Sequence, residues 1–347
     1  MQYNTWLNLM VMIIVIWLAV GCGSNSKAVP DAQIKDIITE EATPNADVVT
    51  DIESFNEMVK DVGNSTPGPQ LVVMTYNVMC SFCVYEDHHD WVTDWNTRIN
   101  WIRDVIKRHN PDLMGIQELS AFQAAYPDEV GDIGDPNVYG SVFYHHTPTD
   151  SFKFDYPDAT VYYRKARFDL LDYGVFWLGP HPDKSFSGGF TGSLYRLVVW
   201  TLLHDHVTGK DFYFATTHFD NNSPNQEESA PLVLSRFEPD AAKAPVILDG
   251  DFNSAPDTTA YKILTTGVNG QGFHFSDTFD LTQTLPHVDS NVNPIPTFDT
   301  SRRIDHIFIA GGQFTVSDWV IDMWHYGDKT QTPSDHDGAV FATITLP

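Results

Sequence analysis

The stretch Leu-Asp-Gly-Asp-Phe-Asn-Ser, residues 248–254, continues the apolar run that begins at Pro245. A short run containing β-branched residues predicts a buried strand. Because alternate side chains of an extended chain point the same way, Asp249, Asp251 and Asn253 are expected on one side of it. Three such oxygen-bearing side chains suit a hard cation or a water that attacks phosphate. The alternative is an ordinary turn, because Gly, Asp and Asn are common in loops.

Five other segments place polar side chains where a predicted strand meets a loop. Such junctions are the usual location of a site in a protein built from layered sheets. One polar junction is expected by chance, but six with metal-binding or acid–base side chains favour a catalytic site. The five segments are the run 71–75 before Tyr76-Asn77, the run 111–116 before Gln117-Glu118, the run 211–217 before His218-Phe219-Asp220, the run 303–309 that contains Asp305 and His306, and Pro333-Ser334-Asp335-His336-Asp337 before the alternating run 339–346.

These motifs, in this order, resemble those of the endonuclease/exonuclease/phosphatase superfamily. The superfamily includes pancreatic-type deoxyribonuclease, abasic-site endonucleases, bacterial sphingomyelinases and inositol-polyphosphate 5-phosphatases. Each motif is weak alone, but six in the right order make a strong signal. They are Thr75-Tyr76-Asn77, Gln117-Glu118, Thr217-His218-Phe219-Asp220, Gly250-Asp251-Phe252-Asn253, Arg303-Ile304-Asp305-His306 and Ser334-Asp335-His336.

The resemblance extends over residues 70–347 and implies an α/β fold, a four-layer α/β/β/α sandwich of two mixed β-sheets flanked by helices. The residue pattern agrees with this fold. A helix is predicted over residues 96–108, because Ile99, Ile102 and Val105 fall on one face and Asn110-Pro111 ends it. Strands dominate from Thr160 onward, with a hairpin at residues 207–210. Two packed sheets with helices outside accommodate this order.

The resemblance implies hydrolysis of phosphodiester or phosphomonoester bonds by in-line attack of an activated water. Asn77, Glu118 and Asp335 would hold one Mg2+ or Mn2+ ion through hard oxygen ligands. His336 would be the general base, or the cation that orients the water. Asp305 would then fix the tautomer of His336 through the other ring nitrogen.

The remaining roles concern the attacking water and the phosphate. Asp251 would align the water for attack. Asn253 and His218 would donate to the non-bridging oxygens as negative charge develops on them. The side chains that fall where relatives carry phosphate-facing groups are Tyr162, Arg164 and Arg196.

One departure from the superfamily pattern concerns His218. In deoxyribonuclease-like relatives an acid follows the Arg matched by Arg196, whereas here Leu197 follows it. This departure argues against a second carboxylate–histidine pair that includes His218.

Two other classes of protein are alternatives to a phosphoesterase of this superfamily. Calcineurin-like phosphoesterases need an Asp-x-His motif near the start of the domain and a Gly-Asn-His-Glu/Asp box, and the sequence contains neither. The alternative function is a catalytically inactive surface binding module on the same fold. Degenerate modules of that kind usually lose a catalytic side chain, whereas all of those assigned above are present.

The formal charge of this 347-residue chain is −26, which argues against a basic nucleic-acid groove as the main source of affinity. A phosphodiester substrate remains compatible, because a divalent cation and local Arg side chains can supply positive charge. Nucleic acid, a phospholipid headgroup and a small phosphoester therefore all remain possible substrates. We expect a monomer.

The N-terminal region predicts export. Residues 6–20 are almost wholly apolar but too few to span a membrane comfortably. Residues 1–22 are therefore predicted to be a signal peptide, and Ala19-Val20-Gly21-Cys22 resembles a bacterial lipobox. Lipidation of Cys22 would anchor the chain in a membrane on the periplasmic or outer cell surface. A plain signal peptide and an uncleaved anchor are the alternatives.

Residues 23–69 are predicted to be an acidic disordered tether, because their composition cannot bury enough apolar surface to order itself. The domain would then comprise residues 70–347. Its cysteines, Cys80 and Cys83, lie just after Asn77. There is no second Cys pair to complete a structural zinc site. In an exported protein the two form either a local disulfide near the site, which we prefer, or free thiols.

Overall fold

The computed structural model describes residues 69–347 except 82, 84–89, 120–128, 151–153 and 193. Every described residue lies in one compact unit, which is assigned to residues 66–347. The predicted signal peptide, Cys22 and all of the predicted tether except Pro69 lie outside the described residues. Within the described part, no helix has the length and apolar character needed to cross a membrane.

The first sheet has seven strands in the order β10-β12-β13-β1-β2-β4-β3. β1 is parallel to β2, and β13 is antiparallel to both of its neighbours, β1 and β12. The strands are β1 (Gln70–Asn77), β2 (Leu113–Gln117), β3 (Tyr139–Tyr144), β4 (Tyr156–Arg164), β10 (His287–Asp289), β12 (Thr315–Asp322) and β13 (Ala339–Thr345).

The second sheet has six strands in the order β5-β6-β7-β8-β11-β9. It is also mixed, because β7 is parallel to β8 while β8 is antiparallel to β11. The predicted hairpin at residues 207–210 is confirmed as the turn between β6 and β7. The strands are β5 (Phe168–Trp177), β6 (Leu197–Asp205), β7 (Lys210–His218), β8 (Val246–Asp251), β9 (Ser276–Asp277) and β11 (Asp305–Ala310).

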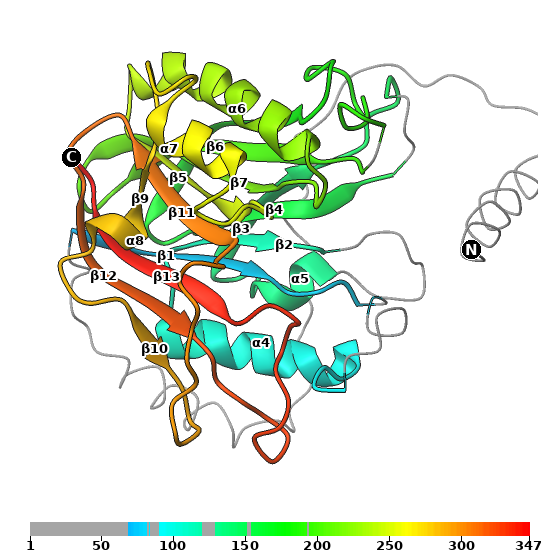
Figure 1. The fold of residues 1–347 in the computed structure, drawn as a ribbon, viewed down its shortest axis with the longest axis vertical. Helices are drawn as coiled ribbons and strands as arrows, with labels where there is room; N and C mark the ends of the chain where they lie inside the picture. The colour runs from blue at the N-terminus through cyan, green and yellow to red at the C-terminus, as the bar shows by residue number, and fades with distance from the viewer. Residues whose placement is uncertain (1–68, 82, 84–89, 120–128, 151–153, 193) are drawn as a thin grey trace, which may run out of the picture. The chain divides into compact units, whose positions relative to one another are not determined.

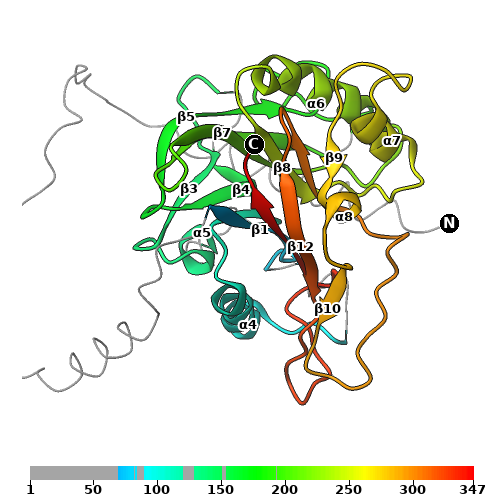
Figure 2. The same ribbon diagram turned by 90° about the vertical axis from the view of Figure 1, so that its left-hand side faces the viewer.

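Helices cover the outer face of each sheet, which confirms the predicted four-layer α/β/β/α sandwich (Figure 1; Figure 2 shows the same layers from the side). Three separate hydrophobic cores fill the three interfaces between layers. The helices on the first sheet are α4 (Trp95–His109) and α5 (Glu129–Ile133). The helices beside the second sheet are α6 (Asn225–Ala241), α7 (Thr259–Thr266) and α8 (Thr278–Leu281).

Helix α4 confirms the helix predicted from periodicity. The Asp94 side chain caps its first turn by accepting from the Thr97 N–H group. Ile102 and Val105 are fully or almost fully buried against the first sheet. Asn110 ends the helix in a left-handed conformation, which asparagine adopts more readily than most residues at the end of a helix.

Helix α6 was not predicted from the sequence. It contains Pro231 and Pro239, and proline in a helix interior usually costs about 3 kcal/mol. Its apolar face compensates, because Val233, Leu234 and Phe237 pack in the core that covers the outer face of the second sheet. Tertiary burial therefore outweighs the local preference against a helix.

Candidate active site

Strand register places three of the predicted side chains in one row across the second sheet. His218 pairs with Asp251 in the parallel β7–β8 ladder. Asp251 in turn pairs with Asp305 in the antiparallel β8–β11 ladder. Three polar strand termini that are far apart in the sequence thus meet at one edge of the sheet.

The first sheet contributes a second row at the same edge of the sandwich. Asn77 pairs with Gln117 across β1 and β2, and Gln117 pairs with Ala159 across β2 and β4. Glu118 follows Gln117, and its main chain turns sharply there with φ at +67°. The Asn77 Nδ2 group spans the two sheets, because it donates to Glu118 Oε1 at 2.9 Å and to Asp251 Oδ2 at 3.0 Å.

His336 lies between two carboxylates. Its Nδ1 atom is 2.7 Å from Asp305 Oδ2, and its Nε2 atom is 3.5 Å from Asp251 Oδ2. Burial opposes the charged imidazolium, but Asp305 and Asp251 outweigh burial and raise the pKa of His336 well above its usual range. The pairing through Nδ1 is the arrangement expected if Asp305 fixes the ring orientation.

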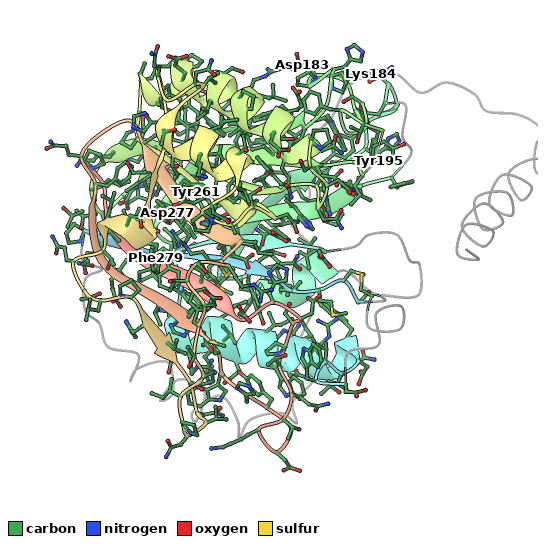
Figure 3. All side chains as sticks on the ribbon, viewed as in Figure 1. Asp183, Lys184, Tyr195, Tyr261, Asp277 and Phe279 are labelled. Carbon is green, nitrogen blue, oxygen red and sulfur yellow. A yellow bond between two sulfur atoms is a disulfide. The ribbon has the colours of Figure 1, made fainter. Side chains whose placement is uncertain are left out.

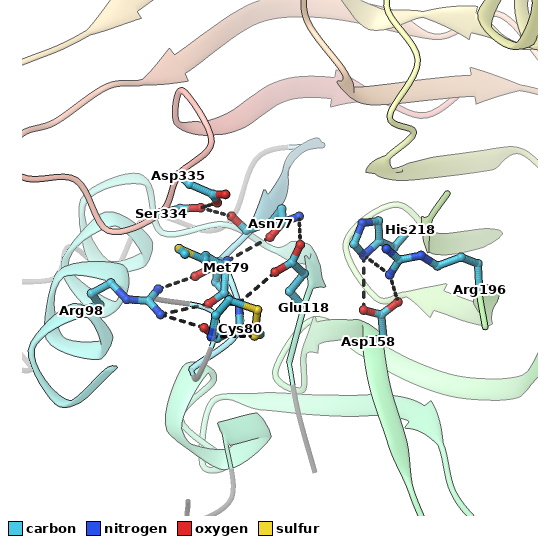
Figure 4. Close-up of a disulfide and its surroundings, with 12 residues drawn as sticks. Asn77, Met79, Cys80, Arg98, Glu118, Asp158, Arg196, His218, Ser334 and Asp335 are labelled. Carbon is cyan, nitrogen blue, oxygen red and sulfur yellow. Dashed lines mark hydrogen bonds and ion pairs between the residues drawn. A yellow bond between two sulfur atoms is a disulfide. The ribbon is translucent and has the colours of Figure 1, made fainter. Parts of the chain in front are cut away.

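His218 has a carboxylate partner that the sequence did not reveal. Asp158, at the start of β4, lies 3.3 Å from His218 Nδ1 and accepts a hydrogen bond from Arg196 Nη1 at 2.8 Å (Figure 4). The expectation that His218 lacks a carboxylate partner is therefore wrong. Asp158 replaces the acid missing at Leu197, and it belongs to a different strand.

The charges around His218 are set by this cluster. Burial and the Arg196 guanidinium disfavour the imidazolium, but Asp158 and Asp251 raise the pKa of His218 to about 9. Burial would also raise the pKa of Asp158, yet Arg196 and His218 lower it to about 2. Burial would likewise raise the pKa of Asp251, but its cationic neighbours His218 and His336 outweigh burial and lower it. Two histidine–carboxylate pairs, His218–Asp158 and His336–Asp305, therefore flank the Asp251 carboxylate.

The donor set near Glu118 fits a hard divalent cation. Glu118 Oε2 accepts from the Cys80 N–H group at 2.9 Å, and Asn77 contributes an amide group beside it. The sulfur atoms of Cys80 and Cys83 are joined in a disulfide, as preferred from the sequence, so they offer no thiolate to a softer metal. The oxygens of Glu118 and the neighbouring carboxylates suit Mg2+ or Mn2+. The Asn77 Oδ1 atom accepts from the Met79 N–H group at 2.9 Å, and its Nδ2 group faces the carboxylates.

Three other residues from the sequence analysis are located as follows. Asn253 lies just beyond β8, and its Nδ2 group donates to the Phe219 carbonyl at 3.1 Å. Asp335 is exposed in the loop that carries His336. Asp249, the third oxygen-bearing residue of the opening stretch, is fully buried between the sheets and lies outside the site.

Two of the three predicted phosphate-binding residues lie away from the site, so their assignment is wrong. Tyr162 is buried and its hydroxyl donates to the Val130 carbonyl at 2.8 Å. Arg164 lies at the opposite end of β4, where it donates to Asn110 Oδ1 at 2.7 Å. Arg196 does reach the site, and its buried Nε–H group has no hydrogen-bond partner among the described residues.

A buried polar cluster packs against β11. Asp277 Oδ2 accepts from Arg303 Nη2 at 3.0 Å and from the Tyr261 hydroxyl at 3.0 Å, and His306 Nδ1 is 3.1 Å away. Tyr261 and Asp277 lie close together on this side of the molecule (Figure 3). The cluster fixes the strand that begins with Asp305.

A cavity of about 480 Å3 opens beside His336. Aspartates outnumber arginines in its wall by four to two, and Phe298 contributes an aromatic ring. Arg303 is already paired with Asp277. The charged lining residues are Asp299, Asp305, Asp335, Asp337, Arg302 and Arg303.

Comparison with known proteins gives one family. The Endonuclease/Exonuclease/phosphatase family model matches residues 74–336. The chain is similar to the CCR4-Not complex 3'-5'-exoribonuclease subunit Ccr4 of Debaryomyces hansenii, with 20% identity over 257 residues that cover 64% of this chain and 30% of that protein. The chain spans about a third of the length of the curated relatives it matches.

Two solved structures from Bacteroides are also similar. An endonuclease/exonuclease/phosphatase from Bacteroides vulgatus has a TM-score of 0.64 and 23% identity, over 80% of this chain and 99% of that chain. A mannosyl-6-phosphatase from Bacteroides thetaiotaomicron has a TM-score of 0.62 and 25% identity, over 79% of this chain and 99% of that chain.

Proposed function

The chain belongs to the endonuclease/exonuclease/phosphatase family, and on that premise we propose that it is a divalent-metal-dependent hydrolase of phosphoester bonds. The observation that carries the proposal is the convergence of two carboxylate–histidine pairs on Asp251, beside Glu118 and Asn77. An inactive binding module would have no need for this arrangement. The arrangement costs folding stability, because each buried charge loses its hydration and must be paired to be tolerated.

Each group has a chemical task. Glu118 and Asn77, with Asp335, would hold Mg2+ or Mn2+, which supplies positive charge to a phosphate oxygen when bound. Asp251 and His336 face each other. The ionised Asp251 carboxylate is placed to accept a proton from the attacking water, and the His336 imidazolium is placed to orient that water.

The positively charged groups complete the site. His218 and Arg196 place positive charge where a phosphate would be held, and Asn253 adds a neutral amide. Such fixed charges stabilise the negative charge that develops in phosphoryl transfer.

We propose a small phosphoester as the substrate in preference to a nucleic acid. The similar proteins include both an exoribonuclease subunit and a mannosyl-6-phosphatase. The formal charge of −26 and the carboxylates that line the cavity beside His336 would repel the further phosphates of a polynucleotide.

A substrate panel tests both parts of this proposal. The protein is assayed with Mn2+ or Mg2+ on p-nitrophenyl phosphate, bis-p-nitrophenyl phosphate, mannose 6-phosphate, sphingomyelin, inositol phosphates, single-stranded DNA and plasmid DNA. We expect turnover of small phosphoesters that EDTA abolishes. A higher kcat/KM on DNA would refute the substrate preference. No turnover of any phosphoester would leave the binding module as the better account.

We also propose that the protein is exported and anchored through lipid on Cys22. The Cys80–Cys83 disulfide supports the proposal, because disulfides persist mainly in oxidising compartments outside the cytosol. Labelled palmitate should enter the wild type and be absent from Cys22→Ser. Equal labelling of the two would show that Cys22 is not the acceptor.

A further inference from the structure

Arg98 is a fully buried cation in the first turn of α4. It lies next to the catalytic edge, the edge of the sandwich at which Asn77 and Glu118 lie. Its ring neighbour is Trp95, whose centroid lies 5.2 Å from the guanidinium carbon. A buried guanidinium needs most of its five N–H groups to be hydrogen-bonded, since each unpaired one is costly.

Five main-chain carbonyls accept hydrogen bonds from this guanidinium. Three of them belong to consecutive residues in the loop that directly follows β1, the strand that ends at Asn77 (Figure 4). The acceptors are Val78 at 2.5 Å, Met79 at 3.0 Å, Cys80 at 3.2 Å, Thr93 at 2.9 Å and Pro333 at 2.9 Å.

Two of these carbonyls belong to peptide groups whose N–H ends hold the predicted metal ligands. The Val78–Met79 peptide accepts from Arg98 and donates from the Met79 N–H to Asn77 Oδ1 at 2.9 Å. The Met79–Cys80 peptide accepts from Arg98 and donates from the Cys80 N–H to Glu118 Oε2 at 2.9 Å.

Each of these two peptides is therefore a bridge between the guanidinium and a ligand side chain. In a low-dielectric interior, hydrogen bonds in such a chain polarise and strengthen one another. A positive charge on the carbonyl side makes the N–H end a better donor. The Asn77 amide and the Glu118 carboxylate are thereby held in one orientation.

The Pro333 carbonyl connects Arg98 to the loop that carries His336. Arg98 Nη1 donates to the Pro333 carbonyl, and the adjacent Ser334 hydroxyl donates to the Asn77 carbonyl at 2.7 Å. The His336 N–H group lies 3.2 Å from the same hydroxyl oxygen. One guanidinium thus connects the loop after β1 to the loop before β13.

The main chain in this loop is held in a conformation that it would not adopt alone. Met79 has φ at +54°, in the left-handed region that non-glycine residues rarely occupy. Such a conformation costs about 1–2 kcal/mol and persists only when the surroundings impose it. The hydrogen bonds on both peptide groups of Met79 impose it here.

We propose that Arg98 is a positioning residue of the catalytic centre, which orients Asn77 and Glu118 through the two peptide groups that flank Met79 and so sets the affinity of the metal site. The proposal rests on the proposed function, because it takes Glu118 and Asn77 as metal ligands. It assigns Arg98 no contact with substrate.

The direct test is metal binding by the full-length protein without substrate. Mn2+ affinity is measured by electron paramagnetic resonance for the wild type, Arg98→Lys and Arg98→Gln. Lysine keeps the charge but offers three donors from one nitrogen, so it cannot reach both peptide groups and Pro333 together. Glutamine removes the buried charge and its desolvation cost, so it remains testable if Arg98→Lys fails to fold.

We expect Mn2+ to bind at least tenfold more weakly to either variant. In steady-state assays of the Arg98 variants, the Mn2+ concentration needed for half-maximal rate should rise by a larger factor than kcat at saturating Mn2+ falls. The matched control is Ile102→Val, which removes a buried methylene from the same helix. It should lower thermal stability and leave Mn2+ affinity within twofold of the wild type.

Glu118→Gln separates failure of this proposal from failure of the proposed function. If Glu118→Gln weakens Mn2+ binding and the folded Arg98 variants do not, Arg98 is not a positioning residue while the metal site stands. If Ile102→Val weakens binding as much as the Arg98 variants, general destabilisation explains the effect and the proposal is overturned. If Glu118→Gln binds Mn2+ like the wild type, the metal site itself is wrong.

Discussion

Asp249→Asn is expected to stabilise the protein at neutral pH. Asp249 is fully buried between the sheets, where its carboxyl packs against Gly115. Neither carboxyl oxygen makes a hydrogen bond of good geometry. Burial therefore raises the pKa of Asp249 well above its usual range, although Thr216 and the Gly115 main chain act weakly in the opposite direction.

The sign and size of the effect follow from proton linkage. An acid whose pKa is raised by folding contributes its full stability below the unfolded pKa of about 3.9 and loses it as pH rises toward the folded pKa. While the folded protein keeps the proton, each pH unit above that value costs about 1.36 kcal/mol. The loss between pH 4 and pH 6 is therefore at most about 2.7 kcal/mol. Asparagine has nearly the same shape and no proton to lose.

The assay is urea unfolding of the wild type and Asp249→Asn at pH 4, 5, 6 and 7. The two should be similar at pH 4, and the advantage of the variant should grow with pH. Asp183→Asn is the control, because Asp183 is exposed and its surface ion pair with Arg236 is worth little. Parallel stability curves for the wild type and Asp249→Asn, or a variant less stable at every pH, would refute the reasoning.

Three further predictions concern activity. His336→Ala and Asp251→Asn should each lower kcat by a factor on the order of 10² to 10⁴. Because both residues act on one step, the loss in the double variant should be far smaller than the product of the two single losses. A fully multiplicative loss in steady-state assays would argue for separate steps. Glu118→Gln should raise the Mg2+ or Mn2+ concentration needed for half-maximal rate at least tenfold; full wild-type activity in EDTA would contradict the metal assignment. Arg164→Ala should leave kcat/KM within twofold, whereas Arg196→Ala should lower it at least tenfold on the same substrate; equal effects would contradict the positions of the two side chains.

The sequence was informative about strand ends that lead into the site. At Asn77, Glu118, His218 and Asp251, an apolar run changes to polar residues within one or two positions. The parallel pairs β1–β2 and β7–β8 make these four ends adjacent within their sheets. The hydrophobic pattern marked these four strand ends, and the family resemblance supplied the expectation that they meet in one site.

Strand β4 shows why other site residues could not be predicted. It runs antiparallel to β2, so its first residues, and not its last, lie at the catalytic edge. Asp158 is there, whereas Tyr162 and Arg164 are four and six positions further along, about 13 Å and 20 Å away at the usual rise per residue. Strand direction depends on the pairing partner, which no local pattern in a single sequence specifies. Arg98 was missed for a related reason, because its role depends on carbonyl groups, which every residue type carries.

The position of β13 has a consequence for synthesis of the protein. This last described strand lies between β12 and β1, and β1 is the first strand of the domain. A growing chain therefore leaves one edge of β1 uncovered until residues 339–345 have left the ribosome. The loop with Asp335 and His336 directly precedes that strand, so it too is made late. Every nascent chain that ends before this point lacks an interior strand of its first sheet and the His336 side chain. Under the proposed mechanism such a chain would have no activity.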